Sequence, residues 1–130
     1  MQTTKWGPDA WCLFGSIVAN YPCNPSESDK RLYQCFFCHL GNILPCIYCR
    51  LSYREYIEEL PIQDWLSNCK KLRYFLYLFH NKVNGKLRSQ GYLKTPNPLF
   101  SKIEKEYNKP IVYNNCGWDF LYSVLFNYPI

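Results

Sequence analysis

The stretch from Ser67 to Leu87 constrains the fold most, because its apolar residues recur every three or four positions. These residues are Leu72, Phe75, Leu76, Phe79, Val83 and Leu87. In an α-helix such positions form one continuous stripe, and a stripe this broad has to be covered by other apolar elements. The segment therefore predicts a long helix that packs along its length against neighbouring helices.

Three further segments carry helix signals. Residues 8–20 have helical apolar spacing and end at "YPCNP". Residues 26–44 begin with two possible serine caps, Ser26 and Ser28, and end before Pro45. Residues 46–59 follow that proline and stop at Pro61. We expect an all-α protein, a four-helix bundle with an additional short helix near residues 98–107 and an apolar C-terminal stretch that docks.

With 130 residues, the chain fits one domain, with a core over residues 1–92 and a C-terminal extension, residues 93–130, packed on the same domain. The N-terminal "MQTTKWGPDAWCLFG" has no apolar run typical of a signal peptide, and Arg73 and His80 interrupt the richest apolar run. The net charge of +5 is scattered, which indicates a solvated surface rather than a nucleic-acid site. A soluble, cytoplasmic protein is expected.

Eight cysteines are many for a chain without an export signal. Cys46 and Cys49 form a Cys-x-x-Cys pair at a predicted helix start, where the positive end of the helix dipole stabilises a thiolate. Such a pair can open and close a disulfide readily. Two small core residues are the alternative interpretation.

Cys35 and Cys38 form a second Cys-x-x-Cys, seven residues before the first. Four thiolates can bind zinc, but the gap is short and both pairs lie in helical, aromatic-rich sequence. As unpaired residues, Cys35 and Cys38 would be ordinary buried side chains, and a secondary redox pair remains the alternative.

His80, Asn84 and Arg88 recur every four residues, with Asn81 and Leu87 beside them. Polar side chains that interrupt an apolar stripe need partners if they are buried. This helix face indicates binding of a large heteroaromatic cofactor, whose phosphates could be bound by Lys86 or Arg88. The alternative interpretation is a helix end that faces water.

Three motifs, in this order, resemble the Erv/Alr family of FAD-dependent sulfhydryl oxidases, in particular the short forms of large DNA viruses. They are "WGPDAWCLFGSIVANYP", "LPCIYCRLSYREYI" and "FHNKVNGKL", and with flanking residues they span about residues 6–92. The resemblance implies a small helical bundle that holds FAD and often forms a homodimer. It also implies a viral late protein, in host cytoplasm or virion.

The resemblance further implies an activity and its residues. Two electrons pass from a protein dithiol, such as a thioredoxin-like carrier, to oxygen, giving a disulfide and hydrogen peroxide. Cys46 would meet the substrate and Cys49 would lie beside the flavin. The implied flavin-site residues are Trp6, Gly7, Trp11, Tyr21, His80, Asn81, Val83, Asn84, Lys86, Leu87, Arg88 and Tyr92. No metal, nucleic acid or membrane is implied.

The chain departs from the family pattern in three places. Gly15 stands where the family has a histidine, which weakens the first helix by up to about 1 kcal/mol. Ser89 stands where a lysine is expected, and no cysteine follows Tyr92 directly. Two alternatives therefore remain, a family member without turnover and a zinc-stabilised interaction module. The pairing of the remaining cysteines stays open, namely Cys12, Cys23, Cys35, Cys38, Cys69 and Cys116.

Overall fold

The computed structural model describes residues 3–108 and 115–126, and within these ranges all regular secondary structure is helical. The α-helices are α1 (Thr3–Ala19), α2 (Glu27–Leu40), α3 (Ile47–Glu59), α4 (Cys69–Ser89), α5 (Phe100–Tyr107) and α6 (Cys116–Phe126). Two short 3-10 segments, η1 (Gly41–Ile43) and η2 (Ile62–Trp65), flank α3 in the chain. The predicted all-α class is confirmed.

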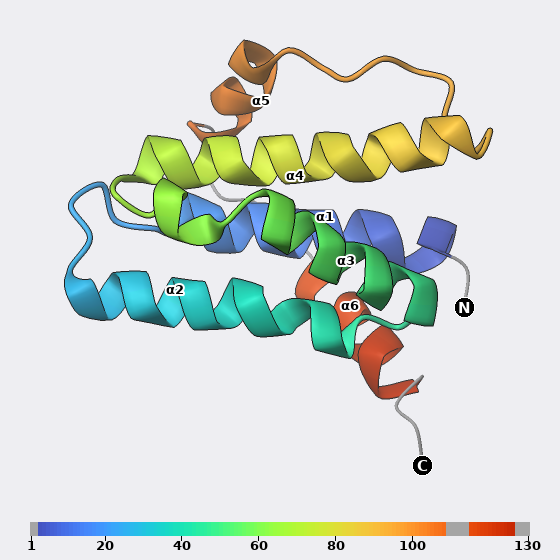
Figure 1. The fold of residues 1–130 in the computed structure, drawn as a ribbon, viewed down its shortest axis with the longest axis horizontal. Coiled ribbons are helices and arrows are strands. Elements are labelled where there is room, and N and C mark those ends of the chain that lie inside the picture. The colour runs from blue at the N-terminus through green and yellow to red at the C-terminus, as the bar shows by residue number, and fades with distance from the viewer. Residues whose placement is uncertain (1–2, 109–114, 127–130) are drawn as a thin grey trace.

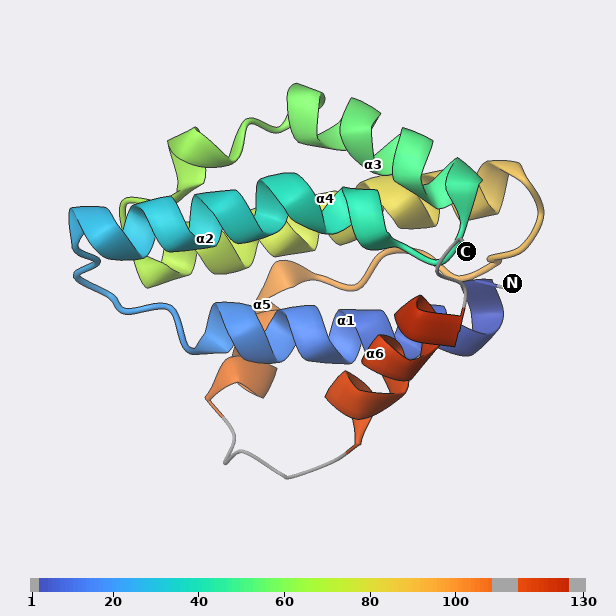
Figure 2. The ribbon, with the colours of Figure 1, turned by 90° about the horizontal axis from the view of Figure 1, so that it is seen from below.

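The long helices lie beside one another along the longest axis of the molecule (Figure 1). α1 and α4 pack together. α4 and α2 lie at opposite sides of the bundle in Figure 1, and α3 and α1 lie at opposite sides in Figure 2. α5 packs against α4, and α6 packs against α1. The described part of the C-terminal extension thus contacts two of the long helices.

Helix starts follow local chemistry closely. Ser26 caps α2: its hydroxyl accepts a hydrogen bond from the Asp29 backbone N–H, and the Ser26 backbone N–H donates one to the Asp29 carboxylate. Asn68 caps α4 by accepting from Lys71 N–H. The first helix was predicted over residues 8–20, but α1 begins at Thr3 and contains Pro8. Trp6, buried against the Phe120 ring, ties down this extra turn.

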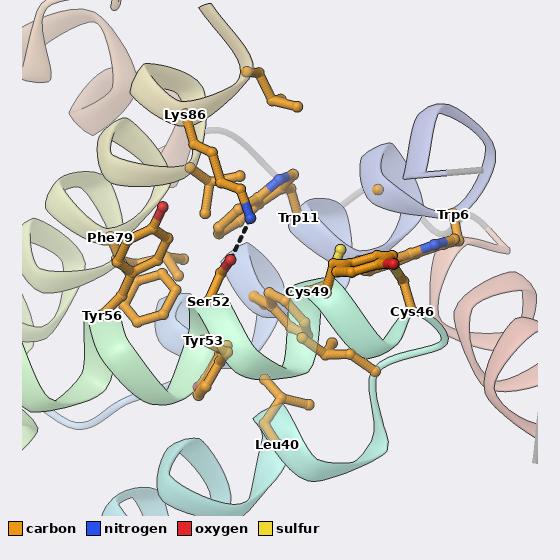
Figure 3. A pocket seen from close by; sticks show the side chains of 18 of the residues that line it. Trp6, Trp11, Leu40, Cys46, Cys49, Ser52, Tyr53, Tyr56, Phe79 and Lys86 are labelled. Carbon is orange, nitrogen blue, oxygen red and sulfur yellow. Dashed lines mark hydrogen bonds between the residues drawn. The ribbon is translucent and has the colours of Figure 1, made fainter. Parts of the chain in front are cut away.

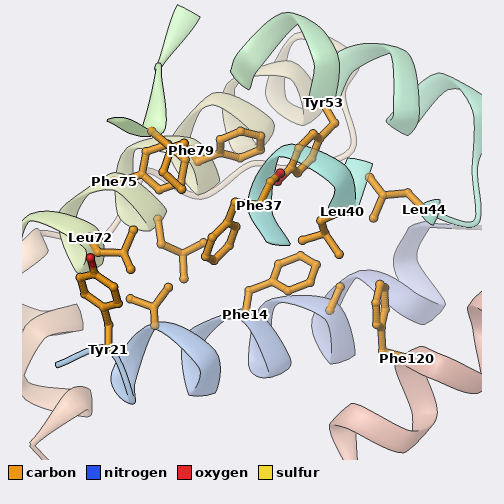
Figure 4. Close-up of a cluster of buried hydrophobic side chains, with 14 of the residues drawn as sticks. Phe14, Tyr21, Phe37, Leu40, Leu44, Tyr53, Leu72, Phe75, Phe79 and Phe120 are labelled. Carbon is orange, nitrogen blue, oxygen red and sulfur yellow. The ribbon is translucent and has the colours of Figure 1, made fainter. Parts of the chain in front are cut away.

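Half of the buried core residues are aromatic, and their rings come from different helices (Figure 4). Phe37 of α2 packs edge-on against Phe75 of α4, with ring centroids 6.0 Å apart. Phe14 of α1 packs in the same way against Phe120 of α6 at 5.5 Å. Because rings in such pairs gain energy beyond area burial, the aromatic content stabilises the contacts between the helices.

A disulfide joins Cys23, in the loop after α1, to Cys69, the first residue of α4. The structure thus gives one of the disulfide pairings that the sequence left open. The remaining cysteines lie elsewhere in the fold. No helix in the described ranges has the length and apolar character needed to cross a membrane.

Candidate active site

The Cys46–Cys49 pair lies at the N-terminus of α3, as predicted. Leu44 and Pro45 are buried and lead the chain into Cys46, which is extended and serves as the N-cap residue. The Cys49 thiol donates a hydrogen bond to the Cys46 sulfur. Both side chains are half-buried and pack against the aromatic core.

The surroundings of Cys46 favour its thiolate. Burial of the sulfur alone would raise its pKa. The backbone N–H groups of Cys49 and Tyr48, together with the Cys49 thiol, outweigh burial and lower the pKa of Cys46 below its ordinary value. Since the thiolate is the nucleophile in disulfide exchange, this setting makes Cys46 reactive.

Both sulfurs open onto a cavity of 310 Å³, here called the thiol cavity (Figure 3). It lies between α1, α3 and α4, and its walls are mostly aromatic and aliphatic. Sequence-predicted residues that line it are Trp6, Gly7, Trp11, Cys46, Cys49, Val83, Lys86, Leu87 and Tyr92. Lys86 donates a hydrogen bond to the Ser52 hydroxyl within it. The volume and lining suit a flat organic ligand.

One polar atom in this wall lacks a partner. The Trp6 indole Nε1 is buried and makes no hydrogen bond to any described residue. Buried N–H groups are almost always paired, so an unpaired one beside a cavity indicates a ligand that supplies an acceptor atom. The wall residues therefore fit a heteroaromatic group with ring nitrogens or carbonyls.

A second cavity of 320 Å³, the histidine cavity, lies on the other side of Trp11 and Leu76, which line both. The predicted residues His80, Asn81 and Asn84 line it, as does Gly15. An added Cβ at Gly15 would meet no atom within 4 Å. The missing histidine side chain thus corresponds to open space beside the polar face of α4.

The His80 imidazole stacks flat on the Trp11 indole, with ring centroids 3.8 Å apart and planes 11° from parallel. Burial lowers the pKa of His80 to about 4. The ring is therefore neutral at pH 7, with one nitrogen that donates and one that accepts.

Two predicted flavin-site residues line neither cavity. The Tyr21 hydroxyl is buried and donates to the Leu66 carbonyl at 2.6 Å, which makes it a link between the end of α1 and η2. Arg88 donates to the Thr95 carbonyl at 2.8 Å and to the Asn97 side chain. It holds the segment that follows α4, so of the two predicted phosphate-binding cations only Lys86 reaches the thiol cavity.

Other lining residues were not predicted. Ser52, Tyr53 and Tyr56 follow Cys49 at three, four and seven positions, and all line the thiol cavity. That helical spacing was a signal that sequence reasoning could have used. By contrast, Pro98 and Tyr107 line the histidine cavity from the C-terminal extension, and no sequence pattern links them to α4.

The second cysteine pair behaves differently from expectation. Cys35 and Cys38 are exposed on α2, which contradicts their interpretation as buried core residues. Burial was expected because they stand among aromatic residues, but the helix turns Phe37 and Leu40 inward instead. In the described ranges no group of three or more His, Cys, Asp or Glu side chains could hold a metal ion. The zinc alternative therefore lacks its ligand set.

A helical bundle with a thiolate-stabilised Cys-x-x-Cys at the wall of an aromatic cavity defines a dithiol protein with a site for a flat cofactor. The sequence model of the Erv1/Alr family matches residues 8–108, and the chain belongs to this family. The resemblance inferred from the three motifs is confirmed. α5 lies inside the matched range, whereas α6 lies outside it.

The relatives with similar sequences are named as FAD-linked sulfhydryl oxidases. The chain is 34% identical over 85 residues to a probable FAD-linked sulfhydryl oxidase of Acanthamoeba polyphaga mimivirus, covering 65% of this chain and 59% of that protein. It is 33% identical over 86 residues to the mitochondrial FAD-linked sulfhydryl oxidase ERV1 of Saccharomyces cerevisiae, covering 66% of this chain and 44% of that one. The match thus spans about half the length of these relatives.

Solved structures agree with the fold. The crystal structure of the FAD binding domain of Erv1 from Saccharomyces cerevisiae superposes with a TM-score of 0.72 at 29% identity, covering 82% of this chain and 94% of that chain. The crystal structure of the yeast Erv1 core gives 0.71 at 27% identity, with 82% and 84% covered.

Proposed function

We propose that this protein is an FAD-linked sulfhydryl oxidase that makes disulfides in protein dithiols and passes the electrons to oxygen. The observation that carries the proposal is the Cys46–Cys49 pair, with the pKa of Cys46 lowered, at the wall of the thiol cavity. Family membership and the names of the relatives support the same activity.

The lining of the two cavities fits FAD. Flat apolar walls and the unpaired Trp6 Nε1 suit the flavin ring, and Lys86 is a cation for a phosphate. The polar side chains of the histidine cavity suit the nucleotide part. The residues that would hold FAD are Trp6, Gly7, Trp11, His80, Asn81, Val83, Asn84, Lys86, Leu87 and Tyr92. When bound, FAD accepts an electron pair from a dithiol and returns it to oxygen as hydrogen peroxide.

The thiol pair performs the exchange with substrate. Starting from the Cys46–Cys49 disulfide, a substrate thiolate attacks the Cys46 sulfur, and Cys49 leaves as a thiolate. A second substrate thiolate then displaces Cys46, which gives the substrate disulfide and leaves Cys46 and Cys49 reduced. The helix N-terminus and the neighbouring N–H groups hold the negative charge on Cys46 as it leaves.

The test is a purified preparation of the full chain. We expect a flavin absorption spectrum and oxygen consumption when dithiothreitol is added. Cys46→Ser and Cys49→Ser should abolish oxygen consumption and retain flavin, whereas Cys35→Ser, on the exposed face of α2, should consume oxygen as the wild type does. Protein that binds flavin without turnover would instead identify a non-catalytic family member, and protein that binds no flavin would refute the proposal.

We also propose a homodimer and a cytoplasmic or virion location, as the resemblance to viral short forms suggests. Leu32 and Phe36 on α2, 65% and 36% exposed, offer apolar surface for a second copy. Sedimentation of the wild type and of Leu32→Glu tests the dimer, since a charge in the interface should give monomers.

A further inference from the structure

Two cysteines outside the thiol cavity lie in contact across α1 and α6. The Cys116 thiol donates a hydrogen bond to the Cys12 sulfur. Cys12 lies in the middle of α1, and Cys116 is the first residue of α6. Both side chains are half-buried. These residues are 104 positions apart in the sequence, so packing of the two helices, not local spacing, brings the sulfurs together.

The contact is embedded in close packing between α1 and α6. A Cβ on Gly117 would lie 3.4 Å from the Leu13 Cδ1, so the chains approach closely beside the two thiols. One α6 turn further on, Phe120 is 1% exposed and packs on Phe14 and Trp6. This packing holds Cys116 over Cys12 and limits the movement needed to join the sulfurs.

We propose that Cys12 and Cys116 are a disulfide-forming site that covalently joins the C-terminal helix to the bundle, and that a small-molecule disulfide such as oxidised glutathione is the oxidant. One glutathione thiol leaves when a protein thiolate attacks the oxidant and forms a mixed disulfide. The second protein thiol then displaces the other glutathione. The balance is two protein thiols and one oxidised glutathione to one protein disulfide and two reduced glutathiones.

This site differs from the Cys46–Cys49 pair in its chemistry. Burial, together with the Cys12 thiol, raises the pKa of Cys116 to about 11, which favours the neutral thiol. A thiol held neutral attacks slowly at pH 7, so the bond forms slowly. A thiolate of high pKa is also a poor leaving group, so the bond is reduced slowly once it has formed. These properties suit a structural bond between elements rather than a carrier of electrons during turnover.

Peptide mapping of the full chain tests the proposal directly. Protein is equilibrated with oxidised glutathione, its remaining thiols are alkylated under denaturing conditions, and the digest is analysed by mass spectrometry. We expect the Cys12 and Cys116 peptides as one joined species that separates on reduction. The Cys49→Ser variant should give the same joined species, because the bond needs no turnover. Separately alkylated or separately glutathionylated Cys12 and Cys116 peptides would overturn the proposal.

Thermal unfolding provides an independent readout. In oxidised glutathione, the Tm of Cys116→Ser should be lower than that of wild type by about 5–10 °C, since a disulfide that closes a long loop is lost. The difference should vanish in excess dithiothreitol, whereas a purely packing role for Cys116 would leave it unchanged. Cys38→Ser, an exposed cysteine on α2, is the matched control and should keep the wild-type Tm. If Cys116→Ser does not fold, the wild-type peptide map still decides.

Discussion

His80 is held against the Trp11 indole in a setting that favours its neutral form. In the unfolded chain a histidine has a pKa of about 6.5. Burial lowers the pKa of His80 to about 4, so between these two values the unfolded chain binds more protons than the folded one. Protonation of His80 at mildly acidic pH therefore lowers the free energy of unfolding.

The stability of the protein should fall as pH decreases from about 6.5 towards 4, and His80 should contribute about 3 kcal/mol to the loss. His80→Phe keeps a ring on Trp11 but cannot titrate, so its free energy of unfolding should fall less steeply in this window. Urea unfolding at several pH values measures both slopes. His39→Phe, on the exposed face of α2, is the matched control, and equal slopes for wild type and His80→Phe would contradict the assignment.

Gly41 is needed for a contact that no sequence pattern reveals. A Cβ at this position would lie 2.2 Å from the Tyr53 ring, whose hydroxyl donates to the Phe37 carbonyl at 2.5 Å. The ring is 7% exposed and cannot move away without losing that bond. The small size of the residue at position 41 therefore lets η1, which follows α2, lie against α3.

Gly41→Ala should destabilise the protein by about 2 kcal/mol, the usual range for forcing an extra group into a packed site. Gly85→Ala is the matched control, because its Cβ would meet no atom within 4 Å and it lies inside α4. That variant should gain up to about 1 kcal/mol from better helix propensity. Chemical denaturation measures the free energy of unfolding of both variants, which should decrease for Gly41→Ala and increase for Gly85→Ala. Equal changes in the two variants would show that the Tyr53 ring moves aside to make room for the added methyl group.

At the scale of elements, α3 shows where pattern reasoning succeeds and where it stops. Pro45 and the following cysteine predicted the helix start, and Cys46 is indeed the N-cap. The exposure of Ile47, Tyr48 and Leu51, at 53%, 73% and 53%, was not predictable, because large apolar residues are normally assigned to the core. These three form an apolar face beside Cys46.

We expect this apolar face to receive the protein substrate. Leu51→Ser should raise the KM for a protein dithiol, such as reduced unfolded ribonuclease A, about tenfold, because a partly desolvated apolar contact is worth about 1–2 kcal/mol. The rate with dithiothreitol should not change, because this small molecule needs only the Cys46 sulfur and Leu51 does not line the thiol cavity. Leu121→Ser, which changes an exposed leucine on α6, is the matched control and should keep the wild-type KM. A parallel loss with both substrates would place the effect at the thiol pair rather than in docking.

At the scale of the whole molecule, the spacing of apolar residues and the positions of prolines predicted the long helices. They did not predict which distant segments contact one another. α4 was predicted from its stripe, and it begins at Cys69, two residues after the expected start. The C-terminal stretch was expected only to dock, and it forms α6 on α1. Which cysteines meet depends on how the loops cross the bundle, so Cys23 with Cys69 could not be deduced from spacing.

The Cys23–Cys69 disulfide restrains the loop after α1 against the first turn of α4 and closes a loop with a sequence separation of 46. Cys23→Ser, Cys69→Ser and the double variant should each lower the free energy of unfolding by about 2–4 kcal/mol, since all three remove the same restraint on the unfolded chain. The double variant should therefore be no less stable than the weaker single variant, because the two changes act on one bond. Thermal unfolding without reductant measures this, and Cys35→Ser, with an exposed side chain and no part in the bond, should match the wild type. Additive losses in the double variant would mean that the two side chains stabilise the fold through separate packing contacts instead.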